Sequence, residues 1–330
     1  MSETAPDKPS RYPFPPYANG WFRIAYADEI ERGTLRSFHL LGRELVAFRD
    51  EAGRARVLDA FCPHLGAHLG HGGRVVAGDR IRCPFHAWEF DGEGTCVRVP
   101  YAEKIPPKAK LRAWRTCERN GIVFLHHDAA GRPPAYEIPV LAEIGSPDWT
   151  PLEIRHWTVA ARWLDMNENC VDRVHFKYVH GAHTIPESEI SAEGPVFRVR
   201  NRMKLGTPQG EVDGGIDTTD HGPALQIVRL SGIVDTVMLN TATPIDAETT
   251  DVSFAYTVST AGGADAARGV GAAIIRDLEK QMAQDIPIWE NKAFWERPVL
   301  AQEDEGFNVY RKWYRQFFSE ADRPGMGTAT

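Results

Sequence analysis

Residues 61–90, FCPHLGAHLGHGGRVVAGDRIRCPFHAWEF, place the strongest limit on how this chain can fold. They contain two of the five cysteines and four of the twelve histidines of the sequence, between segments with the composition of short strands. Cys62 and His64 form a Cys-x-His pair, and eighteen residues further on Cys83 and His86 form a Cys-x-x-His pair. Two such pairs predict that two loops meet at one metal centre.

The ligand types allow two kinds of metal centre. Two thiolates and two imidazoles can bind one zinc ion tetrahedrally, but finger-type zinc sites usually group the cysteines in one loop and the histidines in the other. Here each loop offers one cysteine and one histidine, which suits a 2Fe-2S cluster in which Cys62 and Cys83 bind one iron. His64 and His86 then bind the second iron. We therefore predict a 2Fe-2S cluster, with zinc as the alternative.

The two loops, CPHLGAHL and CPFHAWEF, resemble the Rieske motif. Residues around the ligands also fall where that motif has them: Pro63, Leu65, Gly66, Pro84 and Trp88. Rieske proteins of respiratory complexes carry an additional cysteine in each loop, and these positions hold Ala67 and Phe85 here. The resemblance therefore implies the lower-potential Rieske domains of oxygenases and their ferredoxins.

A second group of candidate ligands lies in residues 166–183, MNENCVDRVHFKYVHGAH. Asn169, Asp172 and His175 follow one another at intervals of three, so they share one face of a helix. His175 and His180 are five residues apart, which corresponds to about 140° on a regular helix. The helix must therefore bulge or end if both imidazoles are to bind one ion.

Two histidines and one carboxylate with open positions form the facial triad of non-haem Fe(II) oxygenases. The His-x-x-x-x-His spacing and the sequence QMAQDIPIWENK resemble the catalytic domain of Rieske non-haem iron oxygenases. This resemblance implies that His175, His180 and Asp285 bind a mononuclear Fe(II). It also implies that Asp172 links this iron to a Rieske histidine. Asn169 is expected to form a hydrogen bond near the iron without binding it.

Other interpretations of these charged residues remain open. Asp285 is an ordinary exposed acid of its helix if Glu290 or Asp277 is the ligand instead. Glu168 is expected to be a solvated helix charge, and Cys170 a small buried residue.

Composition excludes several classes of protein. The net charge of −7 and the lack of a dense Lys/Arg run argue against a nucleic-acid partner. The start, MSETAPDKPSRYPFPPYANG, lacks the apolar core of a signal peptide, and no stretch approaches about 18 apolar residues. Five cysteines without a secretion signal do not indicate a disulfide framework. We expect a cytoplasmic protein without a membrane span.

The predicted fold class is α+β. Short strands in residues 21–127 indicate an all-β unit, which we assign to a Rieske domain in residues 1–135 with its core at about 17–127. Residues 136–330 are predicted to form the catalytic domain, with an antiparallel sheet packed against long helices in a helix-grip, START-like arrangement. Helices are predicted over 164–179, 265–294 and 308–318, and strands over 196–205, 224–230, 233–242 and 252–258.

The two metal centres imply an oxygenase, in which Fe(II) binds O₂ beside a substrate and the cluster supplies electrons. No Gly-x-Gly-x-x-Gly fingerprint follows a strand, so we expect an NAD(P)H-dependent flavin or iron-sulfur reductase as a partner, directly or through a ferredoxin. The resemblance further implies a homotrimer, in which the Rieske domain of one chain lies against the iron of the next.

Segments in the Rieske half, in residues 285–300 and at the C-terminal end resemble the oxygenase of bacterial 3-ketosteroid 9α-hydroxylase and the Neverland-type cholesterol 7-desaturases. This implies hydroxylation or desaturation of a steroid or a similar hydrophobic polycyclic substrate. The alternatives are an aromatic-ring or demethylating Rieske oxygenase and, in another class, a Rieske electron-transfer protein. Five apolar residues are expected either to line a large cavity or to pack in the core: Ile233, Val237, Leu239, Phe254 and Tyr256.

Overall fold

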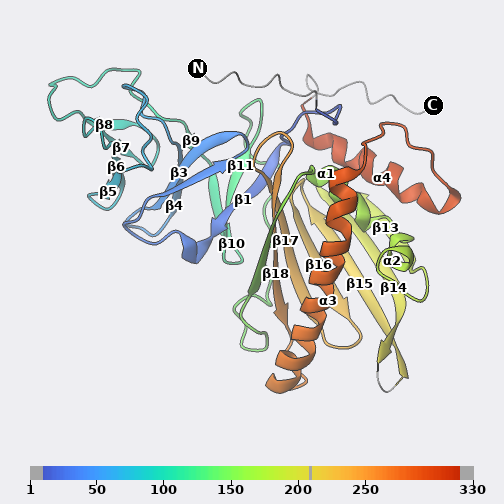
Figure 1. Ribbon diagram of the computed structural model, residues 1–330. Helices are drawn as coiled ribbons and strands as arrows, with labels where there is room; N and C mark the ends of the chain where they lie inside the picture. The colour runs from blue at the N-terminus through green and yellow to red at the C-terminus, as the bar shows by residue number, and fades with distance from the viewer. Residues whose placement is uncertain (1–9, 208–209, 320–330) are drawn as a thin grey trace.

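The computed structural model describes residues 10–207 and 210–319 (Figure 1). Residues 1–9, with the beginning of the polar, proline-rich start, lie outside the described residues, as do 208–209 and 320–330. A β-rich part built from short strands is followed by a part in which a long helix crosses a large antiparallel sheet. The predicted α+β class is therefore confirmed, with an all-β part first and a sheet packed against helices second.

The β-rich part consists of small antiparallel sheets. One has the order β1-β11-β10, from Gly20–Tyr26, Ile122–His127 and Thr116–Arg119. Another has the order β2-β3-β4-β9, from Arg36–Leu40, Arg43–Arg49, Ala55–Asp59 and Ala113–Trp114. A third has the order β5-β6-β7-β8, from Arg74–Val76, Arg80–Arg82, Glu89–Asp91 and Cys96–Arg98. The short helix η1 (Ala27–Glu29) follows β1.

The last two of these sheets enclose a common apolar core. Its largest fully buried members are Phe48, Leu58, Leu69, Ile81 and Phe90. This core supports the loop between β4 and β5, which carries Cys62, and the loop between β6 and β7, which carries Cys83. Both candidate cysteines are thus held by packing and do not lie on free loop tips.

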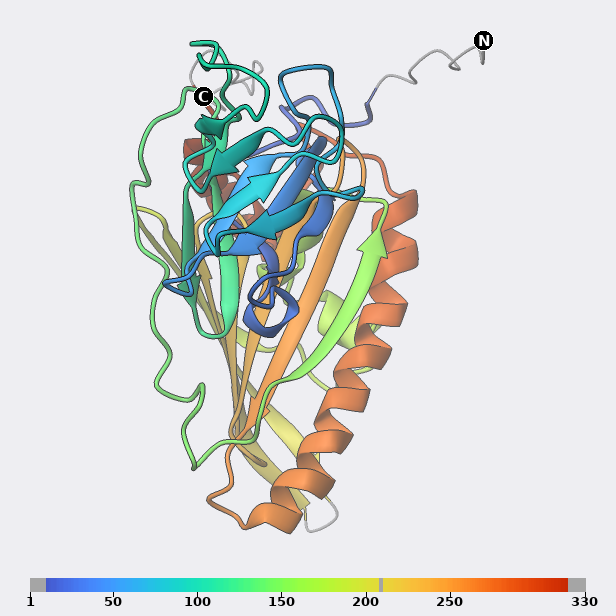
Figure 2. The same cartoon turned by 90° about the vertical axis from the view of Figure 1, so that its left-hand side faces the viewer.

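The second part is built on a seven-stranded antiparallel sheet with the order β12-β18-β17-β16-β15-β14-β13. In this order the strands are Glu153–Val159, Thr250–Val258, Thr236–Pro244, Leu225–Ser231, Gly210–His221, Val196–Thr207 and Glu187–Glu193. The helix α3 (Ala264–Asn291) crosses one face of the sheet (Figures 1 and 2). In the described part of the chain, no helix combines the length and the apolar composition that crossing a membrane requires.

The other face of this sheet packs against the β-rich part. Trp21 of β1 and Phe124 of β11 share a buried cluster with Val237 and Leu239 of β17. Successive residues of a strand point to opposite faces, so the even-numbered neighbours Met238 and Asn240 face α3. Both faces of the central strands are therefore buried, and β17 is buried along nearly its whole length.

The structure differs from the prediction at several elements. The helix expected over 164–179 is broken into α1 (Trp163–Asn167), the 3₁₀ turn η2 (Glu168–Cys170) and α2 (His175–Tyr178). The strands β12, β13 and β15 were not predicted. The sequence of β15, GEVDGGIDTTDH, has acidic residues and glycines that are rare in strands, yet β15 pairs with β14 from His221 to Gly210. Tertiary pairing overrides the local preference there.

Short helices follow α3 in the described part of the chain and lie on the side of the sheet where α3 ends (Figure 1). They are η3 (Gln302–Asp304), α4 (Glu305–Tyr314) and η4 (Arg315–Phe317). Tyr310 and Trp313 of α4 pack against Phe197 of β14. The helix predicted over 308–318 therefore begins earlier than expected, and its aromatic face closes this end of the core.

Candidate metal centres

The loops that carry Cys62 and Cys83 have the same backbone pattern. The N–H of Gly66 donates to the carbonyl of Cys62 at 2.9 Å, and the N–H of Ala87 donates to the carbonyl of Cys83 at 3.2 Å. Gly66 and Ala87 both have a positive φ, of 72° and 56°. Glycine adopts this conformation freely, whereas alanine does so at a cost. The two loops therefore make equivalent tight turns that place one cysteine each in the core.

The environment of the two thiols fits a bound metal. Cys62 and Cys83 are 2% and 3% exposed. Burial, with a smaller contribution from the neighbouring thiol of Cys83, raises the pKa of Cys62 to about 12. A thiolate at this position is unfavourable by itself, but a coordinated metal ion supplies the compensating positive charge.

The two histidines of these loops lie together. The ring centroids of His64 and His86 are 4.7 Å apart, and His64 stacks on Trp88 at 4.6 Å with an interplanar angle of 8°. Nδ1 of His86 is buried and has no hydrogen-bond partner among the residues that the structure describes. Because buried polar nitrogens normally have partners, this atom fits a metal ligand. The four residues together fit a 2Fe-2S cluster with cysteine and histidine ligands.

The second centre is arranged by the short helix α2. Oδ1 of Asp172 accepts hydrogen bonds from the N–H groups of Val174 and His175, both at 3.1 Å, so the Asp172 side chain holds the backbone at the start of the helix. The helix is little more than one turn long, and Gly181, with a φ of 76°, follows its end. His175 thus begins α2 and His180 lies just beyond it. The predicted interruption of the helix between the two histidines is present.

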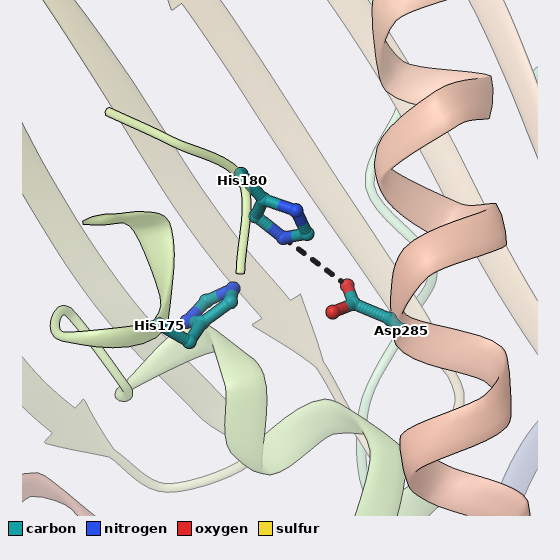
Figure 3. A group of neighbouring side chains, drawn as sticks. All are labelled: His175, His180 and Asp285. Atoms are coloured by element: carbon teal, nitrogen blue, oxygen red, sulfur yellow. Dashed lines mark ion pairs between the residues drawn. The ribbon is translucent and has the colours of Figure 1, made fainter. Parts of the chain in front are cut away.

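The structure brings His175, His180 and Asp285 together (Figure 3). One ligand atom from each lies within 4.8 Å of the others. The two imidazole centroids are 4.9 Å apart, and Nε2 of His180 is 3.4 Å from Oδ2 of Asp285, which projects from α3. Two imidazoles and one carboxylate on converging elements are the donor set of a non-haem Fe(II) site.

Neighbouring oxygen atoms fix the tautomers of both histidines. Nδ1 of His180 lies 3.0 Å from Oε1 of Gln284, and Nδ1 of His175 contacts the backbone carbonyl of Asp172. Each Nδ1 therefore carries the proton, and each Nε2 is left with a lone pair for a metal. Burial lowers the pKa of His175. Burial also acts to lower the pKa of His180, but hydrogen bonds to Asp285 and Gln284 outweigh it and leave the pKa raised.

The alternative acidic ligands lie elsewhere. Asp277 is exposed on α3 and accepts a hydrogen bond from Gln281 at 2.9 Å. Glu290 is also exposed, and its Oε1 accepts a hydrogen bond from the N–H of Ala160 at 3.0 Å. Neither residue belongs to the group of ligand atoms around His175.

The remaining candidates lie beside this group. Oδ1 of Asn169 accepts a hydrogen bond from Nε1–H of Trp289 at 3.2 Å, and Asn169 lines the cavity described below without joining the ligand atoms. The carboxylate of Asp172 is 26% exposed, and its Oδ1 lies 3.9 Å from Nδ1 of His175. Asp172 therefore touches both the backbone that positions His175 and the surface.

Glu168 was wrongly expected to be a solvated helix charge. It is 3% exposed, and its two carboxylate oxygens bind Nε and Nη2 of Arg311 on α4. Lys292 lies 3.9 Å from the same carboxylate. Burial raises the pKa of Glu168, and the hydrogen bonds and charge of Arg311 oppose that shift. The fork-shaped guanidinium compensates for the burial of the acid.

Replacing Arg311 with alanine is expected to lower the free energy of unfolding by about 3–5 kcal/mol, because it leaves the buried Glu168 without its hydrogen-bonded partner and with only the longer contact to Lys292. Lys312→Ala, an exposed position on the same helix, is expected to change it by less than about 0.5 kcal/mol. Adding Glu168→Gln to Arg311→Ala should restore part of the loss. Denaturant titration of the three variants measures this, and equal effects of Arg311→Ala and Lys312→Ala would contradict it.

The candidate ligands open onto a cavity of about 150 Å³ between the sheet and α3. Its sheet wall is formed by residues of β15 to β18: Ile216, Thr218, Gln226, Val228, Leu230, Met238, Asn240, Val252 and Phe254. Its helix wall includes Leu278, Met282 and Trp289 of α3. The cavity is mostly apolar, with a small number of polar side chains, as in typical small-molecule sites.

Of the five apolar residues considered for the cavity, only Phe254 lines it. Val237 and Leu239 lie on the opposite face of β17, in the cluster shared with the β-rich part. Ile233 is 47% exposed in the turn before β17, and Tyr256 is fully buried in the core. On β17 the cavity is therefore lined by Met238 and Asn240, which follow the expected Val237 and Leu239, because adjacent residues of a strand face opposite sides.

Known proteins resemble both parts of the chain. Residues 20–113 match the Rieske [2Fe-2S] domain, and residues 125–318 match the 3-ketosteroid 9α-hydroxylase C-terminal domain. The chain is 30% identical to a 3-ketosteroid-9-alpha-monooxygenase, oxygenase component, of Rhodococcus rhodochrous, over 93% of this chain and 82% of that protein. It is 29% identical to cholesterol 7-desaturase nvd 1 of Ciona intestinalis, over 93% of this chain and 70% of that protein.

Solved structures share the fold. Dicamba monooxygenase bound to dicamba superposes with a TM-score of 0.73 at 20% identity, covering 91% of this chain and 97% of that one. Pseudomonas putida CBB5 NdmA with caffeine gives a TM-score of 0.75 at 22% identity, covering 90% of each chain. The predicted cofactors are confirmed as a 2Fe-2S cluster, in preference to zinc, and a mononuclear iron that works with O₂. The chain belongs to the Rieske non-haem iron oxygenases whose catalytic part is the 3-ketosteroid 9α-hydroxylase C-terminal domain.

Proposed function

We propose that this protein is the oxygenase component that hydroxylates or desaturates a steroid or a similar hydrophobic polycyclic molecule. The observation that carries the proposal is the group of His175, His180 and Asp285 beside a mostly apolar cavity. Relatives support the substrate class, because the names of the Rhodococcus rhodochrous monooxygenase and the Ciona intestinalis desaturase specify a ketosteroid and cholesterol.

In this proposal His175, His180 and Asp285 hold a mononuclear Fe(II), which supplies the activation of O₂ when it is bound. The carbonyl of Asp172 and the side chain of Gln284 hold the two imidazole rings through Nδ1. The apolar walls bind the substrate and exclude water from the ligand atoms.

The size of the cavity bears on how a substrate enters. Its volume of about 150 Å³ is below the roughly 300–1,000 Å³ typical of small-molecule pockets. A rigid polycyclic molecule therefore requires the walls to move apart. Met166, Met238 and Met282 line the cavity, and methionine adapts readily to a new shape. We expect substrate binding to rearrange these side chains.

A homotrimer is part of the proposal. The sheet β5–β8, beside which the cluster loops lie, and α2 are on opposite sides of the molecule (Figure 1). We propose that electrons pass from the cluster of one chain to the iron of its neighbour, with Asp172 as the carboxylate at the contact. Exposed apolar side chains beside the cluster loops would be covered there: Phe61 at 52%, Leu65 at 64% and Phe85 at 60%. A single-chain mass of the metal-loaded protein in light scattering would contradict this assembly.

The electron source is a separate protein. The description of the relatives as an oxygenase component implies a reductase partner. We propose an NAD(P)H-dependent flavin or iron-sulfur reductase, acting directly or through a ferredoxin. Five free cysteines accord with a reducing, cytoplasmic location. A domain boundary near residue 135 is supported by the end of β11 at His127 and the start of β12 at Glu153.

The test is turnover by the metal-loaded protein with a reductase, NADH and a panel of steroids. We expect substrate-stimulated O₂ uptake and a product that has gained one oxygen atom or lost two hydrogen atoms. Mass spectrometry distinguishes hydroxylation from desaturation. A fully loaded protein that oxidises aromatic compounds or N- and O-methyl groups but no steroid would overturn the substrate class and retain the oxygenase.

A further inference from the structure

A row of polar side chains interrupts the apolar wall of the cavity. Asp220 on β15 is the cross-strand neighbour of Gln226 on β16, and Gln226 is the cross-strand neighbour of Asn240 on β17. Such neighbours project to the same side of a sheet. The three residues are 1%, 7% and 3% exposed. Gln226 and Asn240 line the cavity, so the far end of this row lies at the cavity wall.

Asp220 determines which way both amides are turned. A carboxylate has no N–H to donate, so Oδ1 of Asp220 accepts from Nε2 of Gln226 at 3.1 Å. Oε1 of Gln226 is therefore directed to Asn240 and accepts from its Nδ2 at 3.0 Å. This leaves Oδ1 of Asn240 as the end of the chain of hydrogen bonds.

A second contact fixes the same orientation, because Nε2 of Gln226 also donates to Oδ1 of Asn167. Nδ2 of Asn167 donates to Oδ1 of Asp220 at 3.0 Å and to the hydroxyl of Tyr310 at 2.8 Å. Oδ1 of Asp220 therefore accepts from two N–H groups. Burial raises the pKa of Asp220 to about 7, and a proton on this acid resides on Oδ2, which has no partner among the described residues. The amides keep their orientation in both protonation states.

The remaining atom of the row needs a donor. Oδ1 of Asn240 is buried and has no hydrogen-bond partner in the described part of the chain. A buried carbonyl oxygen without a partner is unfavourable, and a ligand that donates a hydrogen bond removes that cost. We propose that Oδ1 of Asn240 accepts a hydrogen bond from a hydroxyl group of the substrate.

This inference rests on the proposed function and specifies its substrate further. Two hydrophobic molecules with the same skeleton can carry either a hydroxyl group or a ketone at the end next to β17. The cavity should prefer the one with the hydroxyl group. A ketone oxygen at this place would face Oδ1 of Asn240 with no proton between the two acceptors, which leaves both unsatisfied. A hydroxylated steroid is therefore a better ligand than its oxidised form.

Equilibrium dialysis of the metal-loaded protein tests the preference without turnover. The probes are androstanedione and two alcohols derived from it, one in which the ketone at one end is reduced and one in which the ketone at the other end is reduced, so that each alcohol differs from the dione at one end of one skeleton. We expect one alcohol to bind about 10-fold more tightly than the dione, as for one hydrogen bond to a buried acceptor.

Variants test whether the row of Asp220, Gln226 and Asn240 causes the preference for the alcohol. Asn240→Leu removes the acceptor, and the Kd values of that alcohol and the dione should then agree within about 2-fold. Thr218→Val is the matched control, because Thr218 lines the same cavity outside the row, and it should retain the preference. Asp220→Asn allows the side-chain amides of Gln226 and Asn240 to flip, so it should also weaken the preference.

The outcomes separate this inference from the proposed function. If the dione binds as tightly as both alcohols to the unmodified protein, the acceptor role of Asn240 is wrong and a steroid substrate still stands. If the metal-loaded protein binds none of the three steroids, the steroid class is wrong and the inference fails with it. If Thr218→Val removes the preference and Asn240→Leu does not, the preference has another origin.

Discussion

Replacing Asp285 with alanine is expected to abolish product formation and to leave the 2Fe-2S cluster in place. Asp285 is the acidic member of the group with His175 and His180, so its loss leaves a neutral, two-donor site for a divalent ion. Loss of an outer partner of a metal ligand alone typically costs about 10–100-fold in affinity or activity. Loss of the ligand itself should cost more.

Iron content and visible absorption show whether Asp285→Ala affects the mononuclear site or the 2Fe-2S cluster. The unmodified protein should bind about three irons per chain, and Asp285→Ala about two. The absorption of the cluster should be unchanged, because its ligands lie on loops of the β-rich part. Steroid binding in equilibrium dialysis should also remain, since the apolar walls of the cavity are intact.

Asp277→Ala is the matched control for this variant. Asp277 lies two turns earlier on the same helix, and it is exposed. This variant and Glu290→Ala should both retain three irons and normal turnover. If either of them lost the third iron while Asp285→Ala kept it, the assigned carboxylate would be wrong.

Local spacing predicted part of the site. His175 and His180 lie in one segment, and their separation required a break in the helix, which the structure contains where α2 ends at Tyr178. The Cys-x-His and Cys-x-x-His pairs likewise lie in two loops of a single β unit. Asp285 comes from a helix far along the chain, and only the family resemblance pointed to it. Spacing can identify ligands within a segment, and it carries no information about a distant partner.

The lining of the cavity could not be predicted in the same way. Alternation identifies the inward face of a strand only when the other face is polar. Both faces of β17 are buried, so its sequence does not show whether Val237 or Met238 faces the ligand. The row from Asp220 to Asn240 depends on the register of three strands. Glu168 was misjudged for a related reason, because its partner Arg311 lies 143 residues away.

Replacing Cys83 with alanine is expected to remove the cluster and to spare the mononuclear site. Cys83 is buried beside Cys62, and without one of the two thiolates an iron of the cluster loses half of its cysteine ligands. Iron should fall from about three to about one per chain, and the visible absorption should disappear. Turnover with NADH and the reductase should be lost, because no group remains to pass electrons to the site at His175.

Cys96 provides the control that separates ligation from packing. It is 4% exposed, lies in the same apolar core, and its thiol donates to the carbonyl of Arg98 at 3.6 Å. Cys96→Ala therefore removes a buried sulfur of equal size from the same region and should retain the cluster and turnover. If both variants lost the cluster, the effect of Cys83→Ala would reflect damage to the core. If Cys83→Ala kept three irons, Cys83 would not be a ligand. Loss of the cluster in Cys83→Ala alone, together with loss of a single iron in Asp285→Ala, would locate the two centres in different parts of one chain.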